Sequence, residues 1–364
     1  MNKKMLVAVL SAAILMISAV TVLADNQRDT EAVGAVYAMT NAASGNQVVI
    51  FDRDDEGMLT MTGSISTGGM GSGSALDPLG SQGSLKLSEN HRWLVAVNAG
   101  SNEITVFRVL RDGLKFADKV NSGGIFPVSV TISHNLVYVL NAGGSPNVTG
   151  FILSRRGELH PLAMSTRSLG SGGFAQVGFD PEGERLVITD KADSKILVYS
   201  VDDDGLPSMN PVTSPSHGAT PFGFVFDQRG RLIVVEVGPD AVSSYKIQHD
   251  DTLDVISGSV TNGQVAACWI AENERGDVFT ANPGSGSISA YKDRHGSLVL
   301  LNGVAGTGTT PLDLSITPDG RYLYALDPQN GTIDMFQIEH DGSLISLSTA
   351  DGGFSIFAQG IAAR

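Results

Sequence analysis

Cysteine is almost absent from this chain of 364 residues, since Cys268 is the only one. A single cysteine cannot form an internal disulfide, so packing must stabilise the fold even in an oxidising compartment. Cys268 lies in the apolar stretch VAACWIA, which favours a buried structural thiol over a reactive one.

Basic residues are also few, because 24 Lys and Arg residues stand against 38 Asp and Glu, for a formal net charge of −14. Residues 1–24 contain two lysines and no acid, so the charge without them is −16. A surface this acidic repels phosphate backbones and anionic lipid. We therefore expect no nucleic-acid partner and no membrane contact beyond the N-terminal segment.

Helical periodicity is missing as well. No segment between turns repeats its apolar residues every 3.6 positions over the length of a helix, which excludes parallel βαβ units. The seven histidines lack metal-ligand spacing, so we expect no metal and no cofactor. Aromatic residues make up 6% of the chain, but a hydrophobic content of 42% suffices for a core, and 43 glycines indicate many turns.

The N-terminus has the pattern of a secretory signal. Lys3 and Lys4 precede an apolar run over residues 5–23, and Val-Leu-Ala at 22–24 suits a signal peptidase. We predict a signal peptide over 1–24, a short segment over 25–33, one domain over 34–364, and a secreted or periplasmic location. The alternative is an uncleaved anchor helix, because the run approaches the length of a membrane span.

The stretch LVAVNAGSNEITVF at 94–107 is one of seven similar hairpins, each followed by a second turn such as DDEG, RDG or HDG. From Gly113 to Gly342 these second turns are 44, 48, 47, 44 and 46 residues apart, and the step from Gly57 to Gly113 is 56. The longer step contains GGMGSGS at 68–74, which we interpret as a flexible insertion. A period in the middle forties with four short strands predicts an all-β, seven-bladed propeller of four-stranded antiparallel blades.

The two ends of the domain predict how the ring closes. The chain enters blade one at its second strand, GAVYAM, so that blade lacks an innermost strand. The sequence Phe-Ala-Gln at 357–359 repeats the one at 174–176, which opens another blade. We expect the C-terminal strand to complete blade one and remove an open sheet edge.

At Pro311–Asp327 the repeat PLDLSITPDGRYLYALD resembles the lactonase family of seven-bladed propellers, which includes 6-phosphogluconolactonase and muconate cycloisomerases. The hairpins also resemble the YVTN-type surface propellers, which are not enzymes. The lactonase resemblance implies a histidine where Ala175 stands and an Arg-His pair where Phe222 and Gly223 stand. It also implies a glutamate near Glu236. The missing histidine and arginine argue against efficient lactone hydrolysis.

Each hairpin places a polar residue at the end of its second strand, and these positions are Asn41, Asn98, Asn141, Asp190, Glu236, Asn282 and Asp327. One interpretation is a polar, ligand-binding ring around the channel mouth, joined by Lys191 and Asp193. The other is turn formation, because Asn and Asp satisfy local backbone donors. Glutamate is a poor turn former, so Glu236 fits the second interpretation less well.

Glu236, His217 and Arg167 are the candidate catalytic residues, as a constellation that would replace the family's missing site, since lactone hydrolysis needs a base and cations or donors for the oxyanion. Two hypotheses follow. The favoured one is a monomeric, extracytoplasmic propeller that binds a small molecule or protein at its mouth without efficient catalysis. The alternative is a hydrolase of a small or sugar-derived lactone with a rearranged site.

Overall fold

A computed structural model describes residues 32–364, and all the regular structure in this range is β-strand. No helix that could cross a membrane occurs in this range. The predicted signal peptide, its anchor alternative and residues 25–31 lie outside the described residues.

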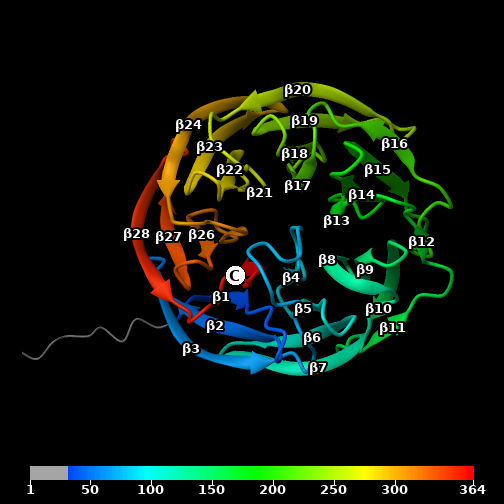
Figure 1. Ribbon diagram of the computed structural model, residues 1–364, viewed down its shortest axis with the longest axis horizontal. Helices are drawn as coiled ribbons and strands as arrows, with labels where there is room; N and C mark the ends of the chain where they lie inside the picture. Colours follow the sequence, from blue (N-terminus) through cyan, green and yellow to red (C-terminus); the bar gives the residue numbers. More distant parts are fainter. Residues whose placement is uncertain (1–31) are drawn as a thin grey trace, which may run out of the picture. The chain divides into compact units, whose positions relative to one another are not determined.

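The strands form seven antiparallel sheets arranged around a central channel (Figure 1). Blade one contains β29 (Ile361–Ala363), β1 (Gly34–Met39), β2 (Gln47–Arg53) and β3 (Leu59–Ser66). Blade two contains β4 (Leu85–Leu87), β5 (Trp93–Asn98), β6 (Glu103–Leu110) and β7 (Gly113–Asn121). Blade three contains β8 (Ile125–Ser133), β9 (Leu136–Gly143), β10 (Asn147–Leu153) and a split outer strand, β11 (Leu159–Pro161) and β12 (Arg167–Ser168).

Blade four contains β13 (Phe174–Phe179), β14 (Arg185–Asp190), β15 (Lys195–Ser200) and β16 (Val212–Pro215). Blade five contains β17 (Pro221–Phe226), β18 (Leu232–Glu236), β19 (Ala241–Ile247) and β20 (Leu253–Thr261). Blade six contains β21 (Trp269–Glu272), β22 (Asp277–Asn282), β23 (Ser287–Arg294) and β24 (Ser297–Thr307). Blade seven contains β25 (Leu314–Ile316), β26 (Tyr322–Asp327), β27 (Thr332–Ile338) and β28 (Leu344–Asp351). The predicted seven-bladed propeller is confirmed.

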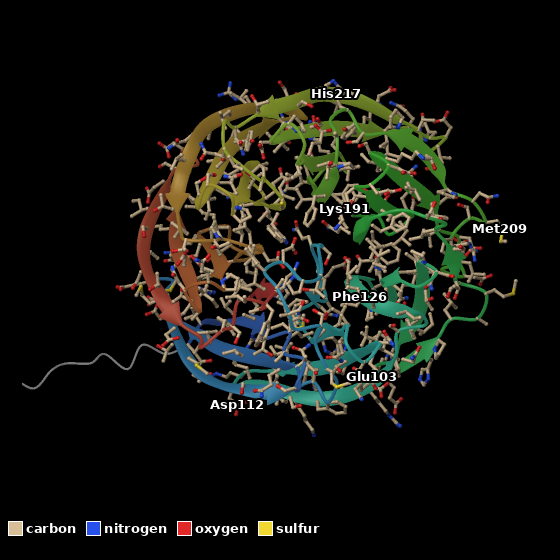
Figure 2. All side chains as sticks on the ribbon, in the orientation of Figure 1. Glu103, Asp112, Phe126, Lys191, Met209 and His217 are labelled. Carbon is tan, nitrogen blue, oxygen red and sulfur yellow. The ribbon has the colours of Figure 1, made fainter. Side chains whose placement is uncertain are left out.

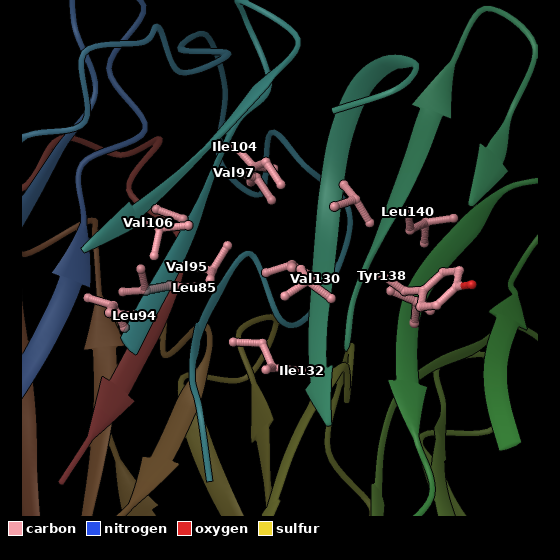
Figure 3. Close-up of a cluster of buried hydrophobic side chains, with 14 of the residues drawn as sticks. Leu85, Leu94, Val95, Val97, Ile104, Val106, Val130, Ile132, Tyr138 and Leu140 are labelled. Atoms are coloured by element: carbon pink, nitrogen blue, oxygen red, sulfur yellow. The ribbon is translucent and has the colours of Figure 1, made fainter. Parts of the chain in front are cut away.

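The core lies between neighbouring blades. The second strands β1, β5, β22 and β26 are buried at every position, because each is covered on both faces. Figure 3 shows Val97 and Ile104 of blade two opposite Val130 and Leu140 of blade three, and all four are at most 1% exposed. Stacking of blades thus buries apolar surface without one oversized core.

In blade one, both the backbone conformation and the packing require a glycine in the second turn. Gly57 has a φ of 82°, which L residues rarely adopt, and a Cβ there would lie 2.3 Å from the ring of Tyr322 in blade seven. In blade five the same turn reads HDDT, and the left-handed conformation falls on Asp251, with a φ of 63°. Aspartate tolerates this conformation better than most residues, so the turn is kept without glycine.

Strand β29 closes the ring as predicted. It pairs antiparallel with β1, in the register Val36 with Ala363, Tyr37 with Ala362 and Ala38 with Ile361. The residues of β29 are at most 7% exposed. The last strand therefore supplies the innermost strand of blade one and leaves no open edge there.

Turns after the second and fourth strands of every blade lie on one face of the ring, which we call the mouth face. Turns after the first and third strands lie on the other, which we call the opposite face. This alternation follows from the antiparallel order of each sheet. It decides which loops can act together.

Candidate functional site

The seven polar residues at or near the ends of the second strands are all buried, with exposed fractions of 3% or less. They are Asn41, Asn98, Asn141, Asp190, Glu236, Asn282 and Asp327. They occupy the predicted positions, but their side chains lie inside the blades. The expected open polar ring at the mouth is therefore not what these residues build.

Hydrogen bonds across the mouth-side turn explain this burial. Asn98 Nδ2 donates to Thr105 Oγ1 at 2.9 Å, and Asn282 Nδ2 donates to Ser289 Oγ at 2.9 Å. Each bond joins a second strand to the third strand of the same blade, seven positions later. The polar residue thus fastens the hairpin.

The aspartates and Asn141 fasten neighbouring loops instead. Asp190 Oδ1 accepts a hydrogen bond from Gly173 N at 3.0 Å, and Asp327 Oδ2 accepts one from Thr309 N at 2.6 Å. Asn141 Nδ2 donates to Ser122 O at 3.1 Å, in the loop before its blade. These contacts fit the turn-forming interpretation of the ring.

Glu236 is the centre of the largest polar cluster in blade five. It is fully buried, and its carboxylate accepts five hydrogen bonds of 2.7–3.0 Å. The donors are Ser216 Oγ, Gly218 N and Tyr245 OH to Oε1, and Ser243 Oγ and Ser259 Oγ to Oε2. A carboxylate has about four lone-pair sites, so this one is saturated.

His217 is exposed and reaches Glu236 only through a serine. Its Nδ1 lies 2.9 Å from Ser259 Oγ, which donates to Glu236 at 2.7 Å. Its ring packs over Gly258 of β20, where a Cβ would lie 2.4 Å from Nε2. Figure 2 labels His217 at the outer rim of the ring, away from the channel.

Arg167 does not join this pair. It is 8% exposed, on β12 at the periphery of blade three (Figure 1). Its guanidinium donates to main-chain carbonyls of Met164, Thr166, Pro207 and Ser208. Arg167 therefore fastens the loop between β15 and β16, and the predicted three-residue constellation is not assembled.

Lys191 lies closer to the channel axis (Figure 2). Its Nζ donates to Gly80 O and lies 5.1 Å from the centre of the Phe222 ring. Burial lowers the pKa of Lys191, and the Asp77 carboxylate opposes this shift. Burial also raises the pKa of Asp77 to about 6. The two groups form a partly desolvated pair at the centre of the mouth face.

Asp77 and Gly80 belong to a segment that crosses the channel, residues 77–84, which we call the plug. It precedes β4 and reaches the middle of the ring (Figure 1). Ser81 O accepts hydrogen bonds from Trp269 Nε1 at 2.9 Å and Gln359 Nε2 at 2.6 Å. Ser81 Oγ donates to Val128 O at 2.8 Å. Ser81 thereby bonds with strands of blades three and six and with the segment before β29.

Gln82 extends the plug to further blades. Its main-chain N donates to Ala175 O at 3.1 Å. Its side chain forms a reciprocal pair with Ile270, donating to O at 2.7 Å and accepting from N at 3.0 Å. The channel is therefore closed on its mouth side.

The stretch just before the plug is also ordered by hydrogen bonds. Gly71 N donates to Ala42 O at 2.9 Å, and Gly73 N donates to Asn41 O at 3.0 Å. A Cβ on Gly71 would lie 2.1 Å from the carbonyl carbon of Asn41. The interpretation of 68–74 as a flexible insertion was wrong, because its glycines permit close backbone packing.

The plug occupies the place where the implied catalytic residues would stand. A Cβ on Gly223 would lie 2.1 Å from Gln82 Oε1 and 2.8 Å from Cys268 O. Phe222 is 4% exposed and packs edge-on against Trp269 at 5.3 Å. Cys268 is buried as expected, and burial raises the pKa of its thiol. A side chain at position 223 would therefore meet the end of the Gln82 side chain and the main chain at Cys268.

Comparisons with known proteins agree with this architecture. The family model "Lactonase, 7-bladed beta-propeller" matches residues 37–168. The 6-phosphogluconolactonase of Bacillus subtilis is 24% identical over 246 residues, which are 62% of this chain and 69% of that protein. Over these residues the chain is similar to the lactonase family of seven-bladed propellers.

Solved structures share the seven-bladed fold of this chain. A Bacteroides fragilis protein named after 6-phosphogluconolactonase has a TM-score of 0.74 at 17% identity, over 92% of this chain and 98% of that one. The periplasmic gluconolactonase of Pseudomonas aeruginosa has a TM-score of 0.73 at 15% identity, over 91% and 98%. At such identities the likeness concerns the fold.

Below the plug the propeller encloses a cavity of about 550 Å³. Its walls are the first strands of all seven blades, and it runs from Gln82 and Gly83 to turns of the opposite face. Lys86, Glu272 and Asp313 contribute charged groups. Sequence reasoning missed this site because it searched the turns, whereas these residues lie on or beside channel-lining strands. The one sequence signal for this site is Lys86, a lysine between the two leucines of β4.

Proposed function

We propose that this lactonase-like propeller acts outside the cytoplasm as a binding protein that does not hydrolyse lactones, and that a protein partner docks on its plugged mouth face. The observation that carries the proposal is the plug, whose Gln82 side chain lies where a Cβ at position 223 would be.

The remaining candidate groups support the absence of hydrolysis. Lactone hydrolysis requires a base to activate water and donors or cations to stabilise the oxyanion. Glu236 is saturated by five donors, His217 lies at the rim, and Arg167 bonds main-chain carbonyls. A base and a cation do not converge from these three residues.

Apolar side chains on the mouth face support docking of a protein. Five large apolar residues in or at the end of the loops that follow fourth strands are between 41% and 56% exposed. They are Met70, Leu76, Ile125, Val265 and Ile356. Because they come from four different loops of one face, they offer apolar contact points around the plug. A protein surface, with apolar residues spaced over a wide area, fits them better than a small molecule does.

The first test measures hydrolysis of δ-gluconolactone in a pH-stat. We expect the purified protein to give the same rate as an equal mass of serum albumin. Robust hydrolysis by the wild type, reduced about a hundredfold or more in Glu236→Gln, would establish the alternative, a hydrolase with a rearranged site.

The second test uses tagged protein as bait in the extracellular fraction of its own source. Met70→Asp places a charge on the mouth face, and Met209→Asp places the same charge on a side loop that is 77% exposed (Figure 2). We expect a partner captured by the wild type and Met209→Asp to be lost with Met70→Asp. Equal capture by both variants, or no capture, contradicts docking at the mouth.

A further inference from the structure

The cavity below the plug has the properties of a ligand pocket rather than of an open channel. Its volume of about 550 Å³ is within the range of small-molecule sites, about 300–1,000 Å³. The plug closes one end, so a molecule can enter only from the opposite face. This pocket is therefore separate from the mouth face.

Lys86 is the one lysine or arginine among the residues that line the cavity. Its side chain is exposed to the space of the cavity while protein surrounds it on all sides. Within residues 32–364 it makes no hydrogen bond or ion pair. Asp313 attracts it electrostatically without forming an ion pair. An ammonium in such a place lacks the partner that buried charges usually have.

The carboxyl groups of Asp313 and Glu272, on or beside channel-lining strands, do not balance this cation as full charges, while Glu89 lines the cavity outside those strands. Burial raises the pKa of Asp313 to about 7 and that of Glu272 to about 8. Glu272 Oε2 is buried and has no hydrogen-bond partner. Asp180, near the open end, is paired with Arg185 at 3.3 Å. Near neutral pH Glu272 is mainly protonated, so it can donate a hydrogen bond.

A single unpaired ammonium and a protonated carboxyl suit an anion that also carries hydroxyl groups. A carboxylate at Lys86 Nζ would form a charge-assisted hydrogen bond in a site of low dielectric. Hydroxyl groups of the same molecule could bond with Ser315 and Thr131, which also line the wall. An amine ligand would be repelled by Lys86.

We propose that the cavity between the plug and the opposite face binds a small hydroxylated carboxylate, with its carboxylate on Lys86. This site goes beyond the proposed function, because it lies on the other side of the plug from the mouth face and needs no protein partner. Its failure would leave docking at the mouth face unaffected.

The test is isothermal titration of full-length mature protein with D-gluconate and with sorbitol, a neutral polyol of the same carbon number. Lys86→Met removes the charge and keeps the length of the side chain. Lys115→Met makes the same change at an exposed position of β7 and is the matched control. Thermal melting of both variants verifies that the ring is intact.

We expect gluconate to bind the wild type and Lys115→Met, sorbitol to bind at least tenfold more weakly, and Lys86→Met to lose about tenfold or more in gluconate affinity. Lys86→Met should melt no lower than the wild type, because a desolvated cation is removed. Absence of gluconate binding, equal binding of sorbitol, or unchanged affinity in Lys86→Met would overturn the proposal. Loss of the fold in Lys86→Met would also overturn it, since Lys86 would then be a structural residue.

Discussion

Glu236→Gln separates a structural role of the buried carboxylate from a chemical one. The substitution keeps the shape of the side chain, removes its charge and turns one acceptor oxygen into an NH2 donor. If the NH2 group replaces Oε2, the hydroxyls of Ser243 and Ser259 must rotate to accept, while Tyr245 and Gly218 keep their acceptor.

The expected cost follows from the five bonds. A hydrogen bond to a charged group contributes about 1.5–3 kcal/mol, and a neutral one about 0.5–1.5 kcal/mol. Relief of the desolvation of a buried carboxylate offsets part of the loss. We therefore expect Glu236→Gln to lower the free energy of unfolding by about 2–4 kcal/mol. Glu236→Ala should cost more, because it leaves five donors without this acceptor, and two of them, on Ser243 and Tyr245, are fully buried.

The assay is urea unfolding at pH 7, read by tryptophan fluorescence, with the slope against urea as a check that the transition is unchanged. Glu56→Gln, in an exposed turn of blade one, is the control and should change stability by less than about 0.5 kcal/mol. A Glu236→Gln protein as stable as the wild type would refute the reasoning. Loss of lactone hydrolysis in a Glu236→Gln protein of unchanged stability would refute the structural role more strongly.

Three other predictions concern closure, pH and export. Deleting residues 354–364 removes β29 and buried side chains such as Phe354. Burial of each large apolar side chain contributes about 1.5–3 kcal/mol, so the cooperative melting transition should be lost. An unchanged melting temperature would contradict closure by β29. Burial raises the pKa of Glu272 from 4.5 to about 8, so the folded protein keeps a proton that the unfolded chain releases, and stability should fall as pH rises through this window. Glu272→Gln should weaken that fall and be more stable than the wild type at pH 8.5 in urea unfolding; a steeper fall would show the opposite sign. Exported protein should begin at or near Asp25 by N-terminal sequencing, and recovery of Met1 would favour the anchor.

The repeated part of the fold was predictable because each blade obeys the same local rules. Turn glycines such as Gly57 recur with a fixed spacing, since left-handed backbone and tight packing demand them in every blade. The polar ends of the second strands were found for the same reason. Their burial was not found, because a sequence pattern does not distinguish Asn98 bonding Thr105 from Asn98 facing solvent.

The unrepeated part of the fold could not be predicted in this way. The plug occurs once, and its hydrogen bonds join residues far apart in sequence, as between Gln82 and Ile270. No periodicity marks such contacts. The placement of Arg167 was missed for a related reason, since its partners are main-chain carbonyls, which every residue carries.

The pairing of β1 with β29 also dictates an order of folding. The two strands lie at opposite ends of the described sequence, so the ring cannot close until residues 361–363 have been synthesised. Until then blade one remains a sheet with an unpaired edge. The entropy lost in closing so large a loop therefore belongs to the last step of folding. The first blade thus stays incomplete until the last strand of the described sequence is available.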